Sequence, residues 1–579
     1  MHVRCGPRFV SRSMLPLLLV GAAASLMAPL VWAADEAKSG EQGWKRGELA
    51  APDGNSSGEV ELPSGVSPTT VIDLLVEAGW QRDGATPSDR CDDATFVRRI
   101  HLDLAGRIPT VQEAEAFLAD TSSDKRATLV DKLLTSEEYA RHMAEVFDVV
   151  LMGRVAEMLE GDRRAARLVR DRDSHGWPEY LRRSFSDNRP WDQMVREMLL
   201  ARPTEPEQAG SSWFLYERNE DAQRMAEAVS PAIFGVRIDC AQCHDHPLAF
   251  EIAQAHYWGL VSFFRRTKNG RSGGDPVVEE SAIGGFEQFA DLSGQTSEAV
   301  LTFLEAGTVE EPRPADGEKQ EDSADLYVSV ELSSGEQRVP KFSRRERLVE
   351  EVVDGNPLVP RAMVNRMWAL LVGRGLVHPV DLMDSMHPPS HPRLLDWLAE
   401  DFAASGFDVK RLVRSIVLSR AYQLDGRATG EHVLSESFAH ALEKPLSAES
   451  YCRSMLVAIE GNAEAEAPEL TEAFCEIFPE VFPEENLATL KQTLFLSNNN
   501  SLWERIRGTS GGTAEALVAI EDAGDRVREA FRRVYGRAPD EEELQAATQF
   551  LTERSADSRA AVDQLLWAMI TSAEFRFNH

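Results

Sequence analysis

The sequence predicts a mainly α-helical protein with two helical domains, joined by a Gly-rich and acidic segment that carries a small β element. Three observations support this fold class. Apolar residues recur at the 3.6-residue spacing of one helix face through most of the chain from residue 68 onward. Capping residues stand where several of these runs begin. An alternating, strand-like run lies between the two helical parts.

The first residues have the pattern of an export signal. Three arginines precede an apolar run from Met14 to Ala28. Val31 and Ala33 then place small residues at the two positions that a signal peptidase reads, for a cut after Ala33. Residues 1–33 are therefore predicted to be a signal peptide. An uncleaved anchor is the alternative, but the run is short and flanked by prolines. We expect an exported protein of the periplasm, cell envelope or medium, without a membrane span in the mature chain.

Composition limits the function classes. A chain of 579 residues is long enough for more than one domain. Its 95 acidic and 62 basic residues give a net charge of −33, which repels phosphate backbones and makes nucleic acid an unexpected partner. The six cysteines are too few for a disulfide-built scaffold. Loss of Cys5 with the signal peptide leaves an odd number, so at least one thiol is free, metal-bound or attached to a cofactor.

Residues 34–67 are rich in Gly, Ser, Pro and Glu and are expected to be a disordered linker. The first helical domain is predicted at 68–268. Its pattern indicates a first helix that Gly79 ends, and a second from Phe96 to Leu104. Further helix starts and helical runs are predicted at Thr110 with Glu113, Thr135 with Glu138, Trp177 to Leu200, and Asp221 to Phe234.

Residues 269–341 are predicted to be a linker with a short β insert. Leu326 to Leu332 alternates like a strand, and Ser333 to Glu336 is a plausible hairpin turn. The second helical domain follows at 342–579. Its predicted helices and caps are Leu358 to Val372 closed by Gly373, Arg393 to Ala404, Leu412 to Tyr422, and a helix capped by Asp540 and Glu543. Residues 459–486 are acidic and broken by prolines, which predicts irregular structure.

The sharpest chemical feature is Cys240-Ala241-Gln242-Cys243-His244, the pattern of a c-type haem attachment site. Residues three apart share a helix face, so Cys240 and Cys243 can reach the two vinyl groups of one porphyrin. His244 then lies next to the second thiol and can bind the iron as proximal ligand. Export agrees with this interpretation, because bacterial haem c is attached outside the cytoplasm.

Other interpretations of the cluster remain open. Zinc or another divalent metal could be held by Cys240, Cys243, His244 or His246 with a distant ligand. The two thiols could also be a redox pair or merely structural, although the flanks lack the strand-to-helix context of a thioredoxin-like site. His246 suits a supporting role beside a haem better than a ligand role on its opposite face. His256 is a candidate distal ligand, or else a packed core histidine.

At these residues the chain resembles a known family. Cys240 to Pro247 is similar to the hallmark of the domain of unknown function 1549, a planctomycete-type cytochrome-c-like domain, and Arg98 to Thr110 resembles its opening motif. The second half resembles the usual companion, the domain of unknown function 1553. The matching stretches include Val364 to Trp368, His391 to Ala399, Ser419 to Tyr422 and Ser572 to Phe575.

The resemblance implies an exported protein with a suspected haem, and no settled reaction. Many relatives carry an extra upstream cytochrome domain, but residues 34–67 are too short for one and lack cysteine, so at most one haem is expected. His256 stands where the family pattern has an acidic residue.

A second polar group lies in the other half. Arg361, Asn365 and Trp368 share one face of a predicted helix, and His391 opens a later one. They could bind a carboxylate or sugar-like ligand, or form a buried hydrogen-bonded network between helices. We expect Arg361, Asn365 and His391 to face the 240–246 cluster across an interdomain cleft.

The leading functional hypothesis is electron transfer or haem-based redox chemistry with an unidentified redox partner or envelope protein. The alternatives are a non-haem, zinc-like metal protein with a hydrolytic activity, and an envelope scaffold whose cysteines are structural.

Overall fold

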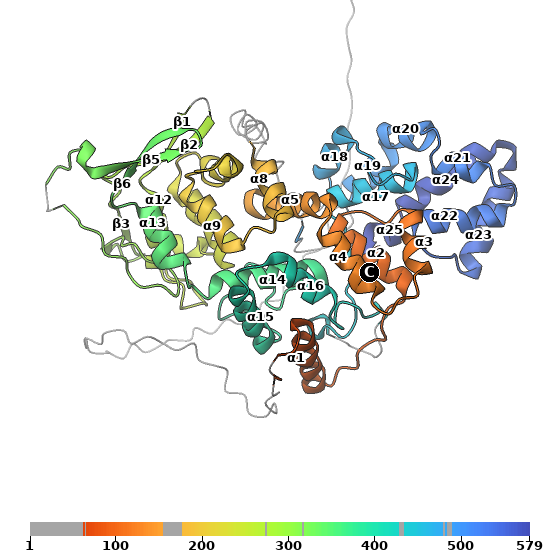
Figure 1. Cartoon of the computed structure of the whole chain (residues 1–579), viewed down its shortest axis with the longest axis horizontal. Coiled ribbons are helices and arrows are strands. Elements are labelled where there is room, and N and C mark those ends of the chain that lie inside the picture. The colour runs from red at the N-terminus through yellow and green to blue at the C-terminus, as the bar shows by residue number, and fades with distance from the viewer. Residues whose placement is uncertain are drawn as a thin grey trace, which may run out of the picture. The chain divides into compact units, whose positions relative to one another are not determined.

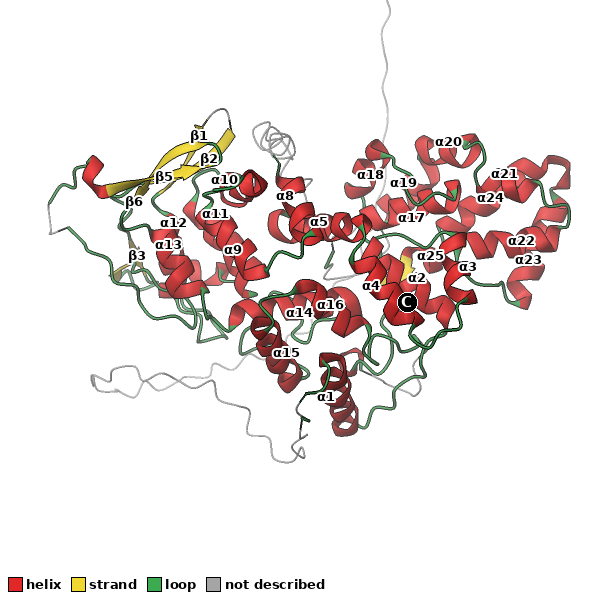
Figure 2. Ribbon diagram, viewed as in Figure 1, coloured by secondary structure: helices red, strands yellow, loops and turns green. Residues whose placement is uncertain are grey.

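The computed structural model describes residues 62–63, 65–153, 176–272, 275–314, 318–427, 434–478, 481–482 and 489–579. The predicted signal peptide and most of the predicted linker lie outside these ranges. Within them the protein is mainly helical, as the sequence predicts, and its strands form only two-stranded antiparallel sheets (Figure 2). None of the helices described has the length and apolar character needed to cross a membrane.

In the described ranges before residue 267, the regular elements are helices and helical turns. Its elements are α1 (Pro68–Asp83), α2 (Asp93–Ala105), α3 (Val111–Ala119), α4 (Lys125–Leu134), α5 (Glu137–Met152), α8 (Trp177–Ser186), α9 (Trp191–Leu200), η1 (Pro206–Ser212), α10 (Trp213–Tyr216), α11 (Ala222–Val229), the π-helical turn η2 (Ser230–Phe234), the 3₁₀ turn η3 (Asp239–Gln242) and α12 (Gln254–Phe264).

The predicted β insert is larger than its sequence indicates. It holds β1 (Thr267–Ser272), β2 (Asp275–Glu280), β3 (Gln288–Ala290), β4 (Thr296–Glu298), η4 (Ala324–Leu326), β5 (Tyr327–Leu332) and β6 (Gly335–Pro340). The β5–β6 hairpin turns at Ser333 and Ser334, as predicted, and it lies beside the β1–β2 hairpin (Figure 2). The first hairpin escaped prediction because Thr267 to Ser272 is mostly polar and lacks the apolar alternation that marks a strand.

The remaining chain is again helical. It contains α13 (Arg344–Arg347), η5 (Leu348–Val353), α14 (Leu358–Val372), α15 (Pro392–Ala404), α16 (Val409–Val417), η6 (Ser435–Ser437), β7 (Lys444–Pro445), α17 (Ala448–Glu460), α18 (Pro468–Cys475), α19 (Leu490–Asn498), α20 (Asn500–Gly508), α21 (Thr513–Val518), α22 (Ala523–Val534), α23 (Glu541–Glu553), η7 (Ser555–Asp557), α24 (Ser558–Ile570), α25 (Ala573–Arg576) and β8 (Phe577–Asn578).

Several predicted helix ends are confirmed. Gly106 ends α2 in the left-handed conformation, and Gly373 ends α14 in the same way. Thr110 and Glu113 form the predicted capping box of α3, and Asp540 and Glu543 form that of α23. Local sequence is sufficient at these points because each cap involves residues only a few positions apart.

Two predicted helix boundaries near the N-terminus are wrong. Gly79 does not end α1, which continues to Gly84. Gly79 serves close packing instead, since a Cβ there would lie 2.2 Å from Nε2 of His391. Thr135 does not cap α5: Ser136 does, accepting a hydrogen bond from the Tyr139 amide, while Thr135 closes α4. Adjacent Ser and Thr are both good caps, so spacing alone cannot choose between them.

Two boundaries in the second half also differ from prediction. Helix α16 ends at Val417, well before Tyr422, and the hydroxyl of Ser419 donates to the carbonyl of Ile416 at this end. The segment 459–486 contains α18, which starts at Pro468. Proline there occupies the first turn, where its missing amide is not needed, so it begins a helix instead of breaking one.

The buried apolar residues of the described chain form two clusters. One draws on residues 71–439, and the other on residues 446–575 together with Leu102 and Ile108 of the first part. Helix α1 packs on α15 and α16 although they lie far along the chain (Figure 1). Helix α14 packs on η2, immediately before the cysteine motif. The predicted domain boundaries at 268 and 342 stay a prediction, but the first core cluster extends across both.

Candidate functional site

The cysteine motif lies in a loop at residues 235–252, here named the Cys loop. Gly235 ends η2 with a φ of +69°, and a Cβ at this position would lie 2.8 Å from Sδ of Met383. Glycine is therefore required both by the backbone conformation and by the close approach of Met383. Val236 then pairs antiparallel with Leu382, and η3 begins three residues later.

Both cysteines of the motif are exposed free thiols. They belong to the single turn η3 and its end, and residues three apart in a 3₁₀ turn eclipse one another. Ala241 between them is fully buried, and its amide donates to the carbonyl of Ile238 at 2.8 Å. The buried alanine anchors the turn while Cys240 and Cys243 remain accessible.

Helix α12 holds the turn from behind. The indole N–H of Trp258 and the side-chain amide of Gln254 both donate to the carbonyl of Gln242 at 3.1 Å. A carboxylate oxygen of Asp245 accepts from the backbone N–H of Gln254 at 2.8 Å. The backbone N–H of His246 donates to the carbonyl of Ile252 at 2.8 Å, which closes the loop. The motif is therefore held by a fixed set of hydrogen bonds.

Hydrogen-bond partners assign the tautomers of the loop histidines. Nδ1 of His244 lies 2.7 Å from the carbonyl of Asp245, which can only accept, so this nitrogen carries the proton and Nε2 keeps its lone pair. Nδ1 of His246 accepts from the amides of Leu248 and Ala249, so its proton is on Nε2. His244 is therefore set to bind a metal through Nε2, whereas His246 is not.

His256 has the same arrangement as His246. Its Nδ1 accepts from the backbone N–H of Ala253 at 3.1 Å and caps the start of α12. Burial lowers the pKa of its imidazole below the usual value, which keeps the ring neutral with the proton on Nε2. The contacts favour the packing role for His256 that the sequence left open.

Apolar side chains stand unusually exposed around the motif. Phe250 is 81% exposed and Leu292 is 79% exposed, and Leu248 also faces solvent. A hollow of about 480 Å³ opens next to His244, with Asp245, Gln254, Phe289 and Leu292 among its walls. Leu292 lines this hollow, whereas Leu248 and Phe250 are exposed on the Cys loop itself. Exposed apolar side chains of this size can mark a surface that binds an apolar group.

No three Cys, His, Asp or Glu side chains come together as a metal-binding group within the described ranges. A tetrahedral zinc site needs four such donors around one point, whereas a haem needs two thiols and one imidazole. The motif supplies two thiols and the imidazoles of His244 and His246, donors that a haem uses and that zinc also uses together with a distant ligand.

The second half of the chain contacts the Cys loop directly. Arg366 of α14 donates to the carbonyls of Pro231 and Ala232 in η2, the turn that leads into the loop. Arg366 also pairs with Asp381 at 2.9 Å. Near the end of the loop, the backbone N–H and hydroxyl of Ser385 donate to the two carboxylate oxygens of Glu251 at 2.6 and 2.8 Å. None of these residues was singled out from the sequence as a contact, since local patterns carry no signal for such pairings.

The other predicted polar group has different partners. Arg361 pairs with Asp396, and the side chain of Asn365 exchanges hydrogen bonds with the backbone of Val377 and donates to Val380. His391 is buried against Gly79 and Phe438. None of the contacts described joins Arg361, Asn365 or His391 to the Cys loop. These contacts favour the buried helix-to-helix network over a ligand site, and the interdomain facing of this group stays a prediction.

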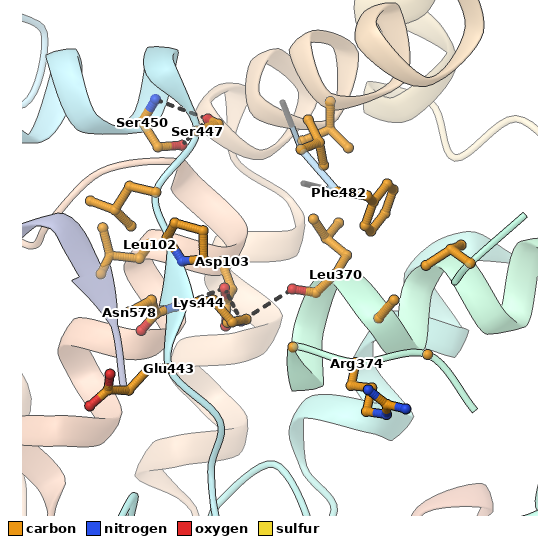
Figure 3. Close-up of a pocket in the computed structure, with 18 of the residues that line it drawn as sticks. Leu102, Asp103, Leu370, Arg374, Glu443, Lys444, Ser447, Ser450, Phe482 and Asn578 are labelled. Atoms are coloured by element: carbon orange, nitrogen blue, oxygen red, sulfur yellow. Dashed lines mark hydrogen bonds and ion pairs between the residues drawn. The ribbon is translucent and has the colours of Figure 1, made fainter. Parts of the chain in front are cut away.

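A separate cavity of about 530 Å³ lies between α2, α14 and the strand β7 (Figure 3). Its central polar groups already bind one another. Lys444 donates to Asp103 at 2.6 Å and to the carbonyls of Leu370 and Leu371, which end α14. Lys444 and Asp103 therefore serve packing, and we place the candidate site at the Cys loop, where two exposed thiols and His244 lie together in one short segment.

The protein is mainly α-helical and has an exposed Cys-x-x-Cys-His turn. Helix α12 binds this turn, and Leu382 and Ser385 of the later chain contact the loop that carries it. Residues 71–269 match the family described as PSCyt2, protein of unknown function (DUF1549). Residues 344–474 match PSD1, protein of unknown function (DUF1553). The chain therefore belongs to both families, which follow one another as the sequence motifs predict. No curated protein and no solved structure matches it.

The structure explains why the opening motif of the first family is polar. Arg99 donates to the carbonyls of Tyr422 and Leu424, and Arg107 pairs with Glu113 and Glu138. Both arginine side chains are buried. Arg99 links the two matched regions, whereas Arg107 binds carboxylates in the first turns of α3 and α5. Their contacts are those of a packing network.

Proposed function

We propose that this protein is an exported c-type haem protein that transfers electrons, with haem attached through Cys240 and Cys243 and His244 as proximal ligand. The observation that carries the proposal is the state of the motif: two accessible free thiols on one turn, beside an imidazole whose Nε2 keeps its lone pair. Haem, when bound, supplies a reversible one-electron couple.

The attachment chemistry needs only the side chains of the turn. Cys240 and Cys243 would hold the haem through thioethers, each made by adding S–H across one vinyl group, so that sulfur bonds one vinyl carbon and the hydrogen goes to the other. The addition is balanced without an external oxidant or reductant. Buried Ala241 and the bonds from Trp258 and Gln254 to Gln242 fix the turn from behind, leaving the thiol side free for the porphyrin.

The surroundings support an apolar cofactor at this place. Three apolar side chains are exposed to water in this region: Leu248, Phe250 and Leu292. A porphyrin that covered them would remove apolar surface from water, which is favourable. The hydrogen bond from Nδ1 of His244 to a carbonyl is the kind of contact that orients a metal-binding imidazole. A zinc site that used His246 through Nδ1 would require this histidine to give up two hydrogen bonds from backbone amides, whereas one that used His244 would not.

The test is the intact mass and absorption spectrum of protein secreted by a host that matures haem c. We expect a Soret band and a mass increase of one haem that survives denaturation. Cys240→Ser and Cys243→Ser should each leave one thioether at most, and His244→Ala should keep the mass but change the spectrum. Cys475→Ser, at a half-buried cysteine outside the Cys loop, is the matched control and should change neither. A colourless protein with stoichiometric zinc would overturn the proposal.

A further inference from the structure

The cavity of about 530 Å³ beside Lys444 has the size of a ligand pocket, since such pockets usually measure about 300–1,000 Å³ (Figure 3). Its wall comes from α2, α5, α14 and α17, from the loop after α14 and from the short strands β7 and β8. Asp103 accepts from Lys444 and Asn578, so this part of the wall is fixed and its two charges cancel. None of the described residues lines both this cavity and the hollow beside His244.

Much of the remaining wall is apolar. The apolar side chains that contribute to it include Leu102, Leu370, Val380, Leu446 and Phe482. Ligand pockets of this kind bury the apolar body of a small molecule and orient it with a few polar groups. The polar groups that are left to an occupant therefore decide its class.

His142 of α5 is a polar wall residue that packing leaves without a partner. It is only 5% exposed, and none of the hydrogen bonds among the described residues involves its ring. Its Nδ1 is buried against Gly106, where a Cβ would lie 2.5 Å away, so Nε2 is the ring nitrogen left for the cavity. Burial, together with the charge of Arg453, lowers the pKa of this imidazole to about 3 and keeps it neutral. A buried polar ring of this kind is a group that a ligand can satisfy.

Arg374 gives the wall a positive charge that is only loosely paired. The residue follows Gly373, and its ion pair with Glu436 is long, at 3.6 Å, with the Glu436 side chain 51% exposed. Burial and the charge of Arg374 both lower the pKa of His378, so the guanidinium and this neutral imidazole lie at the same part of the wall. Glu443 also lines the cavity, but its side chain is exposed to water, which screens its charge.

We propose that this cavity binds a small organic carboxylate with an apolar body. Its carboxylate binds Arg374 beside His378, because a guanidinium matches the two oxygens of a carboxylate. Its body lies against the apolar wall formed by Leu370 and Phe482, and a polar substituent meets Nε2 of His142. The site takes His142 from the first matched region and Arg374 from the second, and it does not depend on a haem at the Cys loop.

Isothermal titration calorimetry of the purified full-length protein with 6-hydroxyhexanoate, hexanoate and hexanamide tests the proposal. We expect both carboxylates to bind and the amide to bind about tenfold more weakly or less, because it loses the charge-assisted hydrogen bonds to Arg374. Arg374→Ala should remove this preference for the carboxylate. Glu436→Gln should bind hexanoate at least as tightly as the wild type, since it frees the guanidinium.

His142→Gln, checked for folding by thermal unfolding, tests the polar substituent. The wild type should prefer 6-hydroxyhexanoate to hexanoate, and the variant should lose this preference while still binding hexanoate. Arg528→Ala is the matched control, because Arg528 is an exposed, ion-paired arginine outside the cavity, and it should bind all three probes as the wild type does.

Three results would overturn the proposal. The first is that neither carboxylate binds at millimolar concentration. The second is that hexanoate and hexanamide bind equally well to the wild type. The third is that Arg374→Ala and Arg528→Ala give the same affinity for hexanoate, which would mean that Arg374 does not hold the carboxylate.

Discussion

The ammonium group of Lys444 lies 2.6 Å from a carboxylate oxygen of Asp103, across 341 residues of sequence (Figure 3). Asp103 also accepts the hydroxyl of Tyr422 and the side-chain amide of Asn578, both at 2.8 Å. One carboxylate of α2 therefore fastens three later parts of the chain. Burial lowers the pKa of Lys444 below its usual value, and the negative charge of Asp103 offsets only part of this effect. The buried ammonium group therefore depends on Asp103 as its counter-charge.

Replacing Asp103 by Asn should lower the free energy of unfolding by about 3–5 kcal/mol, because it leaves a buried ammonium group without its counter-charge. Urea denaturation of the purified protein measures this change. Asp131→Asn is the control, since its partner Arg414 is exposed and a surface pair contributes about 1 kcal/mol or less. The double variant Asp103→Asn with Lys444→Met should recover part of the loss. Equal effects of the two single variants would contradict the central role of Asp103.

Replacing Gly79 by Ala should destabilise the protein although alanine favours helix. The new Cβ would lie 2.2 Å from Nε2 of His391, which is buried and has little room to move. We expect a loss of about 1–3 kcal/mol in the free energy of unfolding. Gly508→Ala, in α20 where a Cβ meets nothing within 4 Å, should be neutral or stabilising.

A double-mutant cycle tests whether His391 is the cause. Gly79→Ala should cost less in a His391→Ala background than in the wild type, because the clashing ring is gone. Additive losses would show that the strain has another source.

Stability should fall as the pH drops from about 6.5 toward 5, because several histidines, His101 and His142 among them, are buried in the neutral state. Burial lowers the pKa of His101 to about 4 and that of His142 to about 3, against 6.5 for an ordinary histidine. Below pH 6.5 the unfolded chain binds these protons while the folded chain does not, so stability is complete above 6.5 and is lost on acidification. Each such histidine contributes about 1.4 kcal/mol per pH unit in this window.

His142→Gln removes one of the histidines that bind a proton only in the unfolded chain. Its free energy of unfolding, measured at several pH values between 5 and 6.5, should decline less steeply than that of the wild type by about 1.4 kcal/mol per pH unit. Parallel pH profiles for the two proteins would mean that His142 has the same pKa in the folded and the unfolded chain. The comparison of slopes is independent of any overall stability loss in the variant.

We also propose export, and its test is the N-terminus of the mature protein. Secreted protein should begin at Ala34, because the small residue Ala33 follows a basic start and an apolar run. Mass spectrometry of the secreted fraction measures this directly. Ala33→Phe should slow the cut and leave uncut chain in the membrane fraction. An intact Met1 in wild-type membranes would contradict the prediction.

The sequence alone determined those features that depend on neighbours along the chain. Helix α14 and its end at Gly373, the capping boxes at Thr110 and Asp540, and the β5–β6 hairpin were all predictable, since caps, turns and periodicity act over a few residues. The Cys-x-x-Cys-His motif was equally visible, because its two thiols and imidazole occupy one turn.

Tertiary structure decided which polar groups are free. Nothing near His246 in sequence distinguishes it from His244, but backbone amides occupy the Nδ1 of one and a carbonyl accepts from the Nδ1 of the other. The contact of Ser385 with Glu251, more than a hundred residues earlier, has no signal in either local sequence. The side-chain amide of Asn365 is already occupied, because it exchanges hydrogen bonds with the backbone of Val377. Sequence fixes which donors and acceptors exist, whereas packing between distant segments decides which of them are satisfied, and an unsatisfied group is what a ligand can bind.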